Sequence, residues 1–342
     1  MKKFLILATA LIFTSTLGAA PKELNIYMID VEGGGGTLIV SPSGESLLID
    51  SGSGGHDDRD PKRIADLARN VAHITKIDYV LITHYHGDHI GGIYALSKLI
   101  PIGRYLDHGE LTLELQKPEM VAWWRDYKAL TGDDRTVLKA GDKIPLKGVN
   151  ATVVIAAGQA ITTPLKGGGP NPVYCKDAVQ KPTDQDPENG MSIGTVLTYG
   201  HFRFSDLGDL PWIQEQLLAC PTNMIGHVDV YQTNHHGFDR SGSPQLVWAL
   251  QPRVAIMNNG FKKAGNQFTF ETIRKSLNFE DLWQSHLSLN ADKAIQSDEK
   301  MIANADPHDD KGYWIQVTVK PDGKYTVTNG RNNFSKSYVA RN

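Results

Sequence analysis

Three histidines and one aspartate are concentrated within six residues of this chain. His84, His86, Asp88 and His89 directly follow the apolar run 79–82, which predicts a short buried strand. Alternate residues that leave a strand point the same way, so His84 and His86 face one point. Asp88 and His89 begin the helix that follows and face a neighbouring point. This order of strand, histidine-rich turn and helix predicts an α/β fold with two adjacent metal ions.

Composition makes chance a weak explanation for this spacing. With 12 histidines in 342 residues, the pattern is expected by chance about once in a thousand such sequences. The alternative interpretation is a histidine-rich turn that faces solvent. Imidazole suits Zn²⁺, and imidazole combined with carboxylate also suits Mn²⁺ or Fe²⁺. We therefore predict a site for two Zn²⁺ ions, with Mn²⁺ or Fe²⁺ as alternatives.

Strand and helix patterns alternate in both halves of the chain. The predicted strands are 24–31, 37–41, 47–50, 78–83, 152–156, 192–199, 202–206, 228–233 and 254–257. The predicted helices begin near residues 60 and 90 and span 120–130, 211–219 and 244–250. Residues 313–319 and 324–328 flank a Pro-Asp-Gly turn and predict a C-terminal hairpin. Because no repeat or clear linker interrupts this pattern, we predict a single domain over residues 21–342.

The charge balance excludes a general attraction to nucleic acid. Lys and Arg number 35 and Asp and Glu number 38, which gives a net charge of −3. A chain without a basic field does not hold long duplexes non-specifically, although a local basic patch can still bind a polyanion. We expect a small-molecule or short nucleic-acid-like substrate. The oligomeric state is left open.

The first twenty residues have the pattern of a secretory signal. Lys2 and Lys3 precede the apolar run 4–13, and small residues follow at 18–20. A membrane anchor is the alternative, but the run is shorter than the roughly 20 residues that span a bilayer. We predict a signal peptide over residues 1–20, cleavage near 18–20, no integral membrane segment afterwards and a periplasmic or secreted protein.

The two cysteines of the chain are Cys175 and Cys220. An exported chain meets an oxidising compartment, where such a pair closes a disulfide. The alternative is two unpaired thiols, because sequence does not show whether their Cα atoms lie within bridging distance.

Further candidate ligands follow two later strands. Asp209 lies between strand 202–206 and the next helix, where a carboxylate can bridge two ions about 3.5–4 Å apart. The alternative role of Asp209 is to cap that helix. Asp206 is a weaker candidate for the carboxylate that bridges the two ions. His235 and His236 end strand 228–233, so at least one of them should reach the second ion. Adjacent residues of a regular strand do not both point inward.

These motifs together resemble the metallo-β-lactamase superfamily. Within it the chain is most similar to the ComEC-like competence-protein hydrolase domains, which carry Asn-x-x-Ser, Gly-Asp and His-His-Gly segments in this order. Here the segments are 189–192, 208–209 and 235–237. The resemblance implies an αββα four-layer sandwich and an exported metal-dependent hydrolase that acts on phosphodiesters or phosphoesters.

The resemblance also implies roles for individual residues. The implied metal ligands are His84, His86, Asp88, His89, Asp209, His235 and His236. Asp88 and Asp209 are the implied catalytic residues, with Asp88 orienting the nucleophile. The candidates for substrate binding are Asn189, Ser192 and Asn259, although Asn259 also fits a plain turn.

Two departures from the family pattern bear on the substrate. No histidine lies between His108 and His201, where lactamases, lactonases and thioesterases of the superfamily have another metal ligand. His108 is the nearest candidate for that ligand, but it also fits a polar turn, whereas His201 is expected at the surface. The gap argues against lactam and thioester chemistry. The segment 32–36, Glu-Gly-Gly-Gly-Gly, replaces the Gly-Gln-Gly-Asp turn common in competence-type domains.

Two rival functions remain open at this point. Hydrolysis of a lactone, lactam or ester would be favoured if His108 were a ligand. A non-catalytic metal-binding protein that assists DNA uptake is the other alternative. The glycine- and proline-rich segment 159–190 is either a lid over the ions or an inert loop.

Overall fold

The computed structural model describes residues 23–111, 117–176 and 186–341. The predicted signal peptide, residues 1–20, lies outside this part of the chain. Among the described residues, no helix has the length and apolar character needed to cross a membrane.

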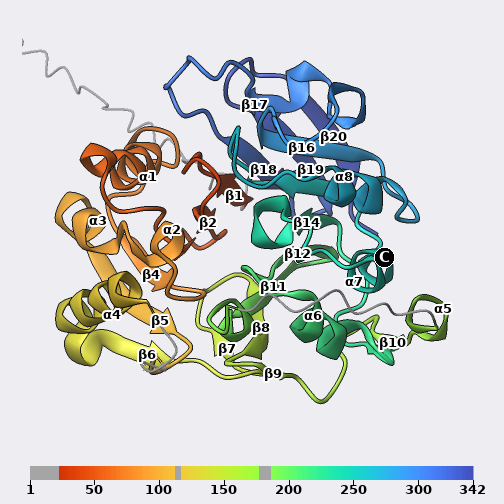
Figure 1. The fold of residues 1–342 in the computed structure, drawn as a ribbon, viewed down its shortest axis with the longest axis horizontal. Helices are drawn as coiled ribbons and strands as arrows, with labels where there is room; N and C mark the ends of the chain where they lie inside the picture. Colours follow the sequence, from red (N-terminus) through yellow and green to blue (C-terminus); the bar gives the residue numbers. More distant parts are fainter. Residues whose placement is uncertain (1–22, 112–116, 177–185, 342) are drawn as a thin grey trace, which may run out of the picture.

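Two large β-sheets form the centre of the molecule (Figure 1). The first sheet contains β1 Leu24–Met28, β2 Thr37–Val40, β3 Ser46–Ile49, β4 Ile77–Leu81, β5 Ile102–Asp107, β6 Arg135–Val137, β18 Ile315–Val319, β19 Lys324–Asn329 and β20 Ser335–Val339. The second contains β7 Lys143–Ile144, β8 Asn150–Ala156, β9 Gln159–Ala160, β11 Gly194–Tyr199, β12 Phe202–Asp206, β14 Val230–Gln232, β15 Val254–Met257, β16 Asp281–His286 and β17 Ile302–Asn304. The short strands β10 Gly169–Pro170 and β13 Thr222–Asn223 pair separately.

Helices cover the outer face of each sheet. They are α1 Arg59–Asn70, α2 Gly87–Ile90, α3 Ile93–Leu99, α4 Pro118–Thr131, α5 Pro172–Cys175, α6 Trp212–Ala219, α7 Pro244–Leu250 and α8 Gln267–Arg274. Figure 1 shows α1, α3 and α4 along one side of the molecule and α6, α7 and α8 along the other.

Three buried apolar clusters hold these layers together. One lies between the two sheets and contains Ile26 and Val317 of the first sheet and Val153 and Phe204 of the second. The other two lie between each sheet and its own helices. Burial of apolar surface on both faces of both sheets is the dominant favourable contribution to such a fold. The architecture is therefore an αββα sandwich, as the resemblance implied.

The direction of the strands determines where polar side chains gather. In the first sheet β3, β4, β5 and β6 are parallel, and in the second sheet β12, β14, β15, β16 and β17 are parallel. The carboxyl ends of parallel strands share one edge of a sheet, which is where open α/β sheets bind ligands. The metal-binding candidates follow β4, β12 and β14 at this edge.

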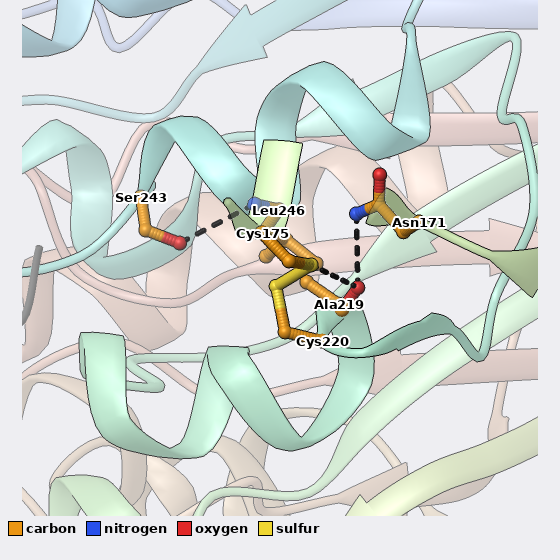
Figure 2. Close-up of a disulfide and its surroundings, with 6 residues drawn as sticks. All are labelled: Asn171, Cys175, Ala219, Cys220, Ser243 and Leu246. Atoms are coloured by element: carbon orange, nitrogen blue, oxygen red, sulfur yellow. Dashed lines mark hydrogen bonds between the residues drawn. A yellow bond between two sulfur atoms is a disulfide. The ribbon is translucent and has the colours of Figure 1, made fainter. Parts of the chain in front are cut away.

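The predicted disulfide is present (Figure 2). Cys175 ends α5 and Cys220 directly follows α6, with an S–S distance of 2.04 Å and a Cα–Cα distance of 5.7 Å. Beside it, the Asn171 amide donates a hydrogen bond of 2.9 Å to the carbonyl oxygen of Ala219. The disulfide therefore links the segment that follows β10 to the end of α6.

Candidate metal centre

The segment after β14 brings two adjacent histidines to the centre. β14 ends at Gln232, and a 3₁₀ turn, η5 (Asn234–Gly237), follows it. His235 and His236 have φ values of 51° and 56°, so neither continues the strand. Their Nε2 atoms each lie 3.4 Å from Oδ2 of Asp209. The expectation that only one of the pair can point inward is wrong, because it assumed a regular strand.

A buried glutamate of α6 holds this turn in place. The Glu215 carboxylate accepts hydrogen bonds from the Asn234 amide at 2.6 Å and from the backbone N–H groups of Gly242 and Ser243 at 2.6 and 2.7 Å. Burial raises the pKa of Glu215, although these donors act against that rise. Glu215 therefore organises the backbone that presents His235 and His236.

Asp209 lies at the centre of the site, close to four histidines. Besides His235 and His236, its Oδ2 atom lies 3.3 Å from Nε2 of His89 and 3.8 Å from Nε2 of His84. The other carboxylate oxygen, Oδ1, is buried and has no hydrogen-bond partner among the described residues. A buried carboxylate oxygen without a donor is costly, and a bound cation would satisfy it.

The potential ligands fall into two neighbouring groups. In one, the ligand atoms of Asp88, His89, Asp209 and His236 all lie within 4.8 Å of one another. In the other, Nε2 of His84 and Nδ1 of His86 are 2.8 Å apart. The first group combines imidazole and carboxylate donors, and the second has two imidazoles; both donor types suit divalent transition metals. The first group therefore offers the donors of one metal site, and the pair His84 and His86 places two further imidazoles beside it.

The surroundings of His84, Asp88 and Asp209 favour the forms of these side chains that bind metals. Burial lowers the pKa of His84 well below its ordinary value, and His89 lowers it further. Burial alone would raise the pKa of Asp88 and Asp209. Histidines around both groups, and Lys263 beside Asp88, outweigh that effect and hold both pKa values well below the usual range. Neutral imidazole and ionised carboxylate are the forms that bind metals. His89 is different: burial lowers its pKa, but the carboxylates of Asp209, Asp50 and Asp88 outweigh that effect and hold the pKa well above its ordinary value.

Contacts behind the ligands fix their orientation, and the role of Asp50 among them was not predicted from the sequence. Asp50, which follows β3, accepts a hydrogen bond of 2.7 Å from Nδ1 of His89 and another of 2.7 Å from the backbone N–H of Thr83. Nδ1 of His236 lies 3.0 Å from the side-chain amide of Asn258. The signal available in the sequence was position, because Asp50 ends the predicted strand 47–50 and Asn258 directly follows the predicted strand 254–257.

Asp50→Asn should weaken metal binding 10- to 100-fold, the usual effect of removing a group that orients a ligand. The amide is a weaker acceptor for the His89 N–H than the carboxylate is. The measurement is a Zn²⁺ titration against a competing chelator. The matched control is Asp66→Asn, an exposed aspartate of α1. Equal affinities for the wild type and Asp50→Asn would show that Asp50 does not support His89.

The end of segment 159–190 packs against the group that contains His84 and His86. Asp186 Oδ2 accepts a hydrogen bond of 2.9 Å from Nε2 of His86, and the buried Glu188 accepts one of 2.9 Å from the Tyr85 backbone N–H. The Ser192 hydroxyl accepts a bond of 3.3 Å from the Asp209 backbone N–H. This end of the segment thus supports the ligands. Residues 177–185, on which the choice between lid and inert loop depends, lie outside the described residues.

The remaining candidates lie apart from the two groups. Nε2 of the buried His108 pairs with Glu188 at 2.8 Å. His201 is exposed in the turn between β11 and β12. Asn259 is buried and its amide donates to the carbonyl oxygen of His286 at 3.0 Å, whereas its neighbour Asn258 contacts the centre. Asn189 is buried in a 3₁₀ turn, η4 (Asn189–Met191), three residues before Ser192.

Two further side chains border the centre without having been predicted there. Lys263 forms an ion pair with Oδ2 of Asp88 and is about one-third exposed. The partly exposed Trp123 of α4 lies against Gly87, where a Cβ atom would collide with its ring. Its neighbour Trp124 is buried in the apolar cluster between the first sheet and its helices.

A second cluster of acidic and imidazole side chains, Asp30, Glu32 and His286, lies near segment 32–36. Asp30 accepts a hydrogen bond of 2.6 Å from Nε2 of His286, and Glu32 Oε2 lies 4.0 Å from the same atom. The Arg63 guanidinium pairs with Asp30 at 2.9 Å and with Glu32 at 3.3 Å. Because Arg63 already supplies the positive charge, we assign no metal to this group.

One family model matches part of the chain. Residues 31–181 match the model of the metallo-beta-lactamase superfamily. An atrochrysone carboxyl ACP thioesterase from Cryptosporiopsis sp. (strain 8999) is 40% identical over 68 residues, which are 20% of this chain and 20% of that protein. The chain thus matches only one fifth of that relative's length.

The solved structures that match this chain share little sequence with it. A putative metal-dependent hydrolase from Parabacteroides distasonis has a TM-score of 0.41 and 16% identity, and the match covers 76% of this chain and 92% of that one. A diiron beta-hydroxylase from Streptomyces venezuelae has a TM-score of 0.40 and 14% identity, covering 76% and 48%. A subclass B3 metallo-beta-lactamase from a soil metagenome library has a TM-score of 0.39 and 13% identity, covering 64% and 78%.

Proposed function

We infer that this chain is a member of the metallo-beta-lactamase superfamily and acts as a metal-dependent hydrolase. The family match includes the histidine motif 84–89, and the fold has the αββα order expected for it. The observation that carries the inference is the position of Asp209, whose Oδ2 atom lies 3.3–3.8 Å from the Nε2 atoms of four histidines. A carboxylate so placed can be shared by two ions.

We assign the ligands from the two groups described above. His84 and His86 would hold one ion, and Asp88, His89 and His236 the other, with Asp209 between them and His235 as a further donor. Zn²⁺ suits this donor set, as do Mn²⁺ and Fe²⁺. When bound, such ions lower the pKa of water toward about 7 and offset negative charge that develops on the substrate.

The protein's own residues would position the reactants. Asp88, the only acidic side chain of the motif, would accept a hydrogen bond from the attacking water and orient it. Lys263, one-third exposed beside Asp88, would offer a cation to an anionic oxygen of the substrate. Glu215 and Asp50 would keep the histidines in place.

We propose phosphodiesters or phosphoesters as the substrate class. The resemblance to ComEC-like hydrolases points to this chemistry. The pairing of His108 with Glu188 at 2.8 Å supports it over lactone, lactam or ester hydrolysis, which would be favoured by His108 as a ligand. The net charge of −3 favours small or short substrates over long duplexes. Residues 1–20 support export to the periplasm or beyond.

Metal analysis paired with a substrate panel tests this proposal. We expect close to two metal ions per purified mature chain and hydrolysis of bis-p-nitrophenyl phosphate that chelation abolishes and Zn²⁺ or Mn²⁺ restores. Turnover of only lactones or lactams would replace the phosphoester proposal with the rival substrate class. A folded chain that takes up no metal under any loading condition would overturn the hydrolase proposal.

A further inference from the structure

A cavity of about 340 Å³ opens at the opposite ends of β12 and β14 from the metal centre. β12 begins at Phe202 and β14 at Val230, and the two strands run in parallel from the cavity toward the ligands. The side chains that can carry positive charge in its lining are Lys143, Lys166, His201, Arg203, His227 and Arg341.

The lining has more positive than negative charge. Four of these residues are lysine or arginine, and among the described residues that line the cavity Asp229 is the only acidic one. Its two carboxylate oxygens accept hydrogen bonds from the backbone N–H groups of Arg203 at 2.9 Å and Arg341 at 3.0 Å. The carboxylate is therefore directed at backbone donors, and the guanidinium groups depend on other partners.

The backbone holds the guanidinium group of Arg203 in place. It donates to the carbonyl oxygens of Lys166, Ile225 and His227 at 3.1, 2.7 and 2.8 Å. Carbonyl oxygens fix the orientation of a guanidinium group without neutralising its charge. Burial lowers the pKa of Arg203, and the nearby Arg341 lowers it further against the opposing effect of Asp229.

The guanidinium group of Arg341 has two nitrogen atoms whose N–H groups donate no hydrogen bond among the described residues. Nη2 of Arg341 donates to the carbonyl oxygens of Val228 and Gln251. Its Nε and Nη1 atoms are buried and have no hydrogen-bond partner among the described residues, and the Asp229 carboxylate is 4.0 Å from Nε. Buried donors without acceptors are costly, and an anionic oxygen would satisfy them.

We propose that this cavity binds a phosphate-bearing small molecule. Its volume lies within the roughly 300–1,000 Å³ of ligand pockets. Guanidinium groups match the oxygens of phosphate through paired, charge-assisted hydrogen bonds, and two of them are fixed here before any ligand arrives. The exposed Lys143 and Lys166 add charge at the rim. The site is separate from the metal centre and does not rest on the proposed function.

Calorimetric titration tests the proposal with two probes, inorganic phosphate and a nucleoside monophosphate. Titrations use chelator-treated Asp209→Ala protein, so that the metal centre does not contribute. We expect Arg341→Gln and Lys166→Gln each to weaken binding at least tenfold, while Lys98→Gln, an exposed lysine of α3, leaves it unchanged. Binding of both probes would identify phosphate itself as the recognised group, and binding of the nucleotide alone would identify a larger ligand.

Two results would overturn the proposal. One is the absence of binding of either probe to folded protein at millimolar concentration. The other is binding that neither Arg341→Gln nor Lys166→Gln weakens. Because Lys166 is exposed, Lys166→Gln is expected to fold, which keeps the test decisive if Arg341→Gln does not.

Discussion

Asp209→Ala should lower kcat/KM at least 100-fold and reduce bound metal, while the far-ultraviolet circular dichroism stays unchanged. Removal of a partner that only orients a metal ligand typically lowers metal affinity or activity 10- to 100-fold. Asp209 faces four histidines directly, so its removal should have a larger effect. Its removal takes away the group that both ions would share. The measurement is hydrolysis of bis-p-nitrophenyl phosphate together with elemental analysis of the same preparation.

The control for this variant is Asp206→Asn. Asp206 is also buried, ends β12, and accepts a hydrogen bond of 3.0 Å from the Gln232 amide. Burial, and then the nearby negative charge of Asp50, raises the pKa of Asp206 to about 7, so a neutral amide is a mild change there. We expect Asp206→Asn to retain metal and turnover. Full activity in Asp209→Ala, or its loss only in Asp206→Asn, would remove Asp209 from the mechanism.

Cys175→Ser should lower the free energy of unfolding by roughly 2–4 kcal/mol. The disulfide closes a loop with a sequence separation of 45 residues, and the loop-entropy relation gives about 4 kcal/mol as the upper value for that length. For a chain of this size the change corresponds to about 3–6 °C in Tm. Differential scanning calorimetry of the oxidised protein measures it.

Two comparisons make this test specific. Cys220→Ser should cause the same loss, and the double variant should lose no more than either single variant. Reduction of the wild type should shift its Tm to that of the variants. If reduction leaves the wild-type Tm unchanged, the bond does not contribute to stability under those conditions.

Sequence patterns predicted the parts of the site that depend on local geometry. His84, His86, Asp88 and His89 follow one strand, and the alternation of side chains along it is enough to separate two groups of ligands. Asp209 was predictable because a strand, a short turn and a helix surround it. Both inferences need only the chain on either side of the residue.

The contacts missed by the sequence analysis join distant segments. His89 depends on Asp50, 39 positions earlier, and the Asn234 turn depends on Glu215, 19 positions earlier. Two strands that each lie second from a sheet edge, β5 and β16, were also missed. β16 reads Asp-Leu-Trp-Gln-Ser-His, and its polar residues are buried by tertiary contacts, so the segment shows no continuous apolar run.

The backbone conformation of His235 and His236 lowers the stability of the fold but places two side chains in the metal centre. A non-glycine residue with positive φ costs roughly 1–2 kcal/mol, and both histidines have it. Glycine at either position would relieve that strain but remove a side chain that faces Asp209. Selection for thermal stability alone would therefore favour losing these imidazoles, and only selection for the activity of the centre would keep them.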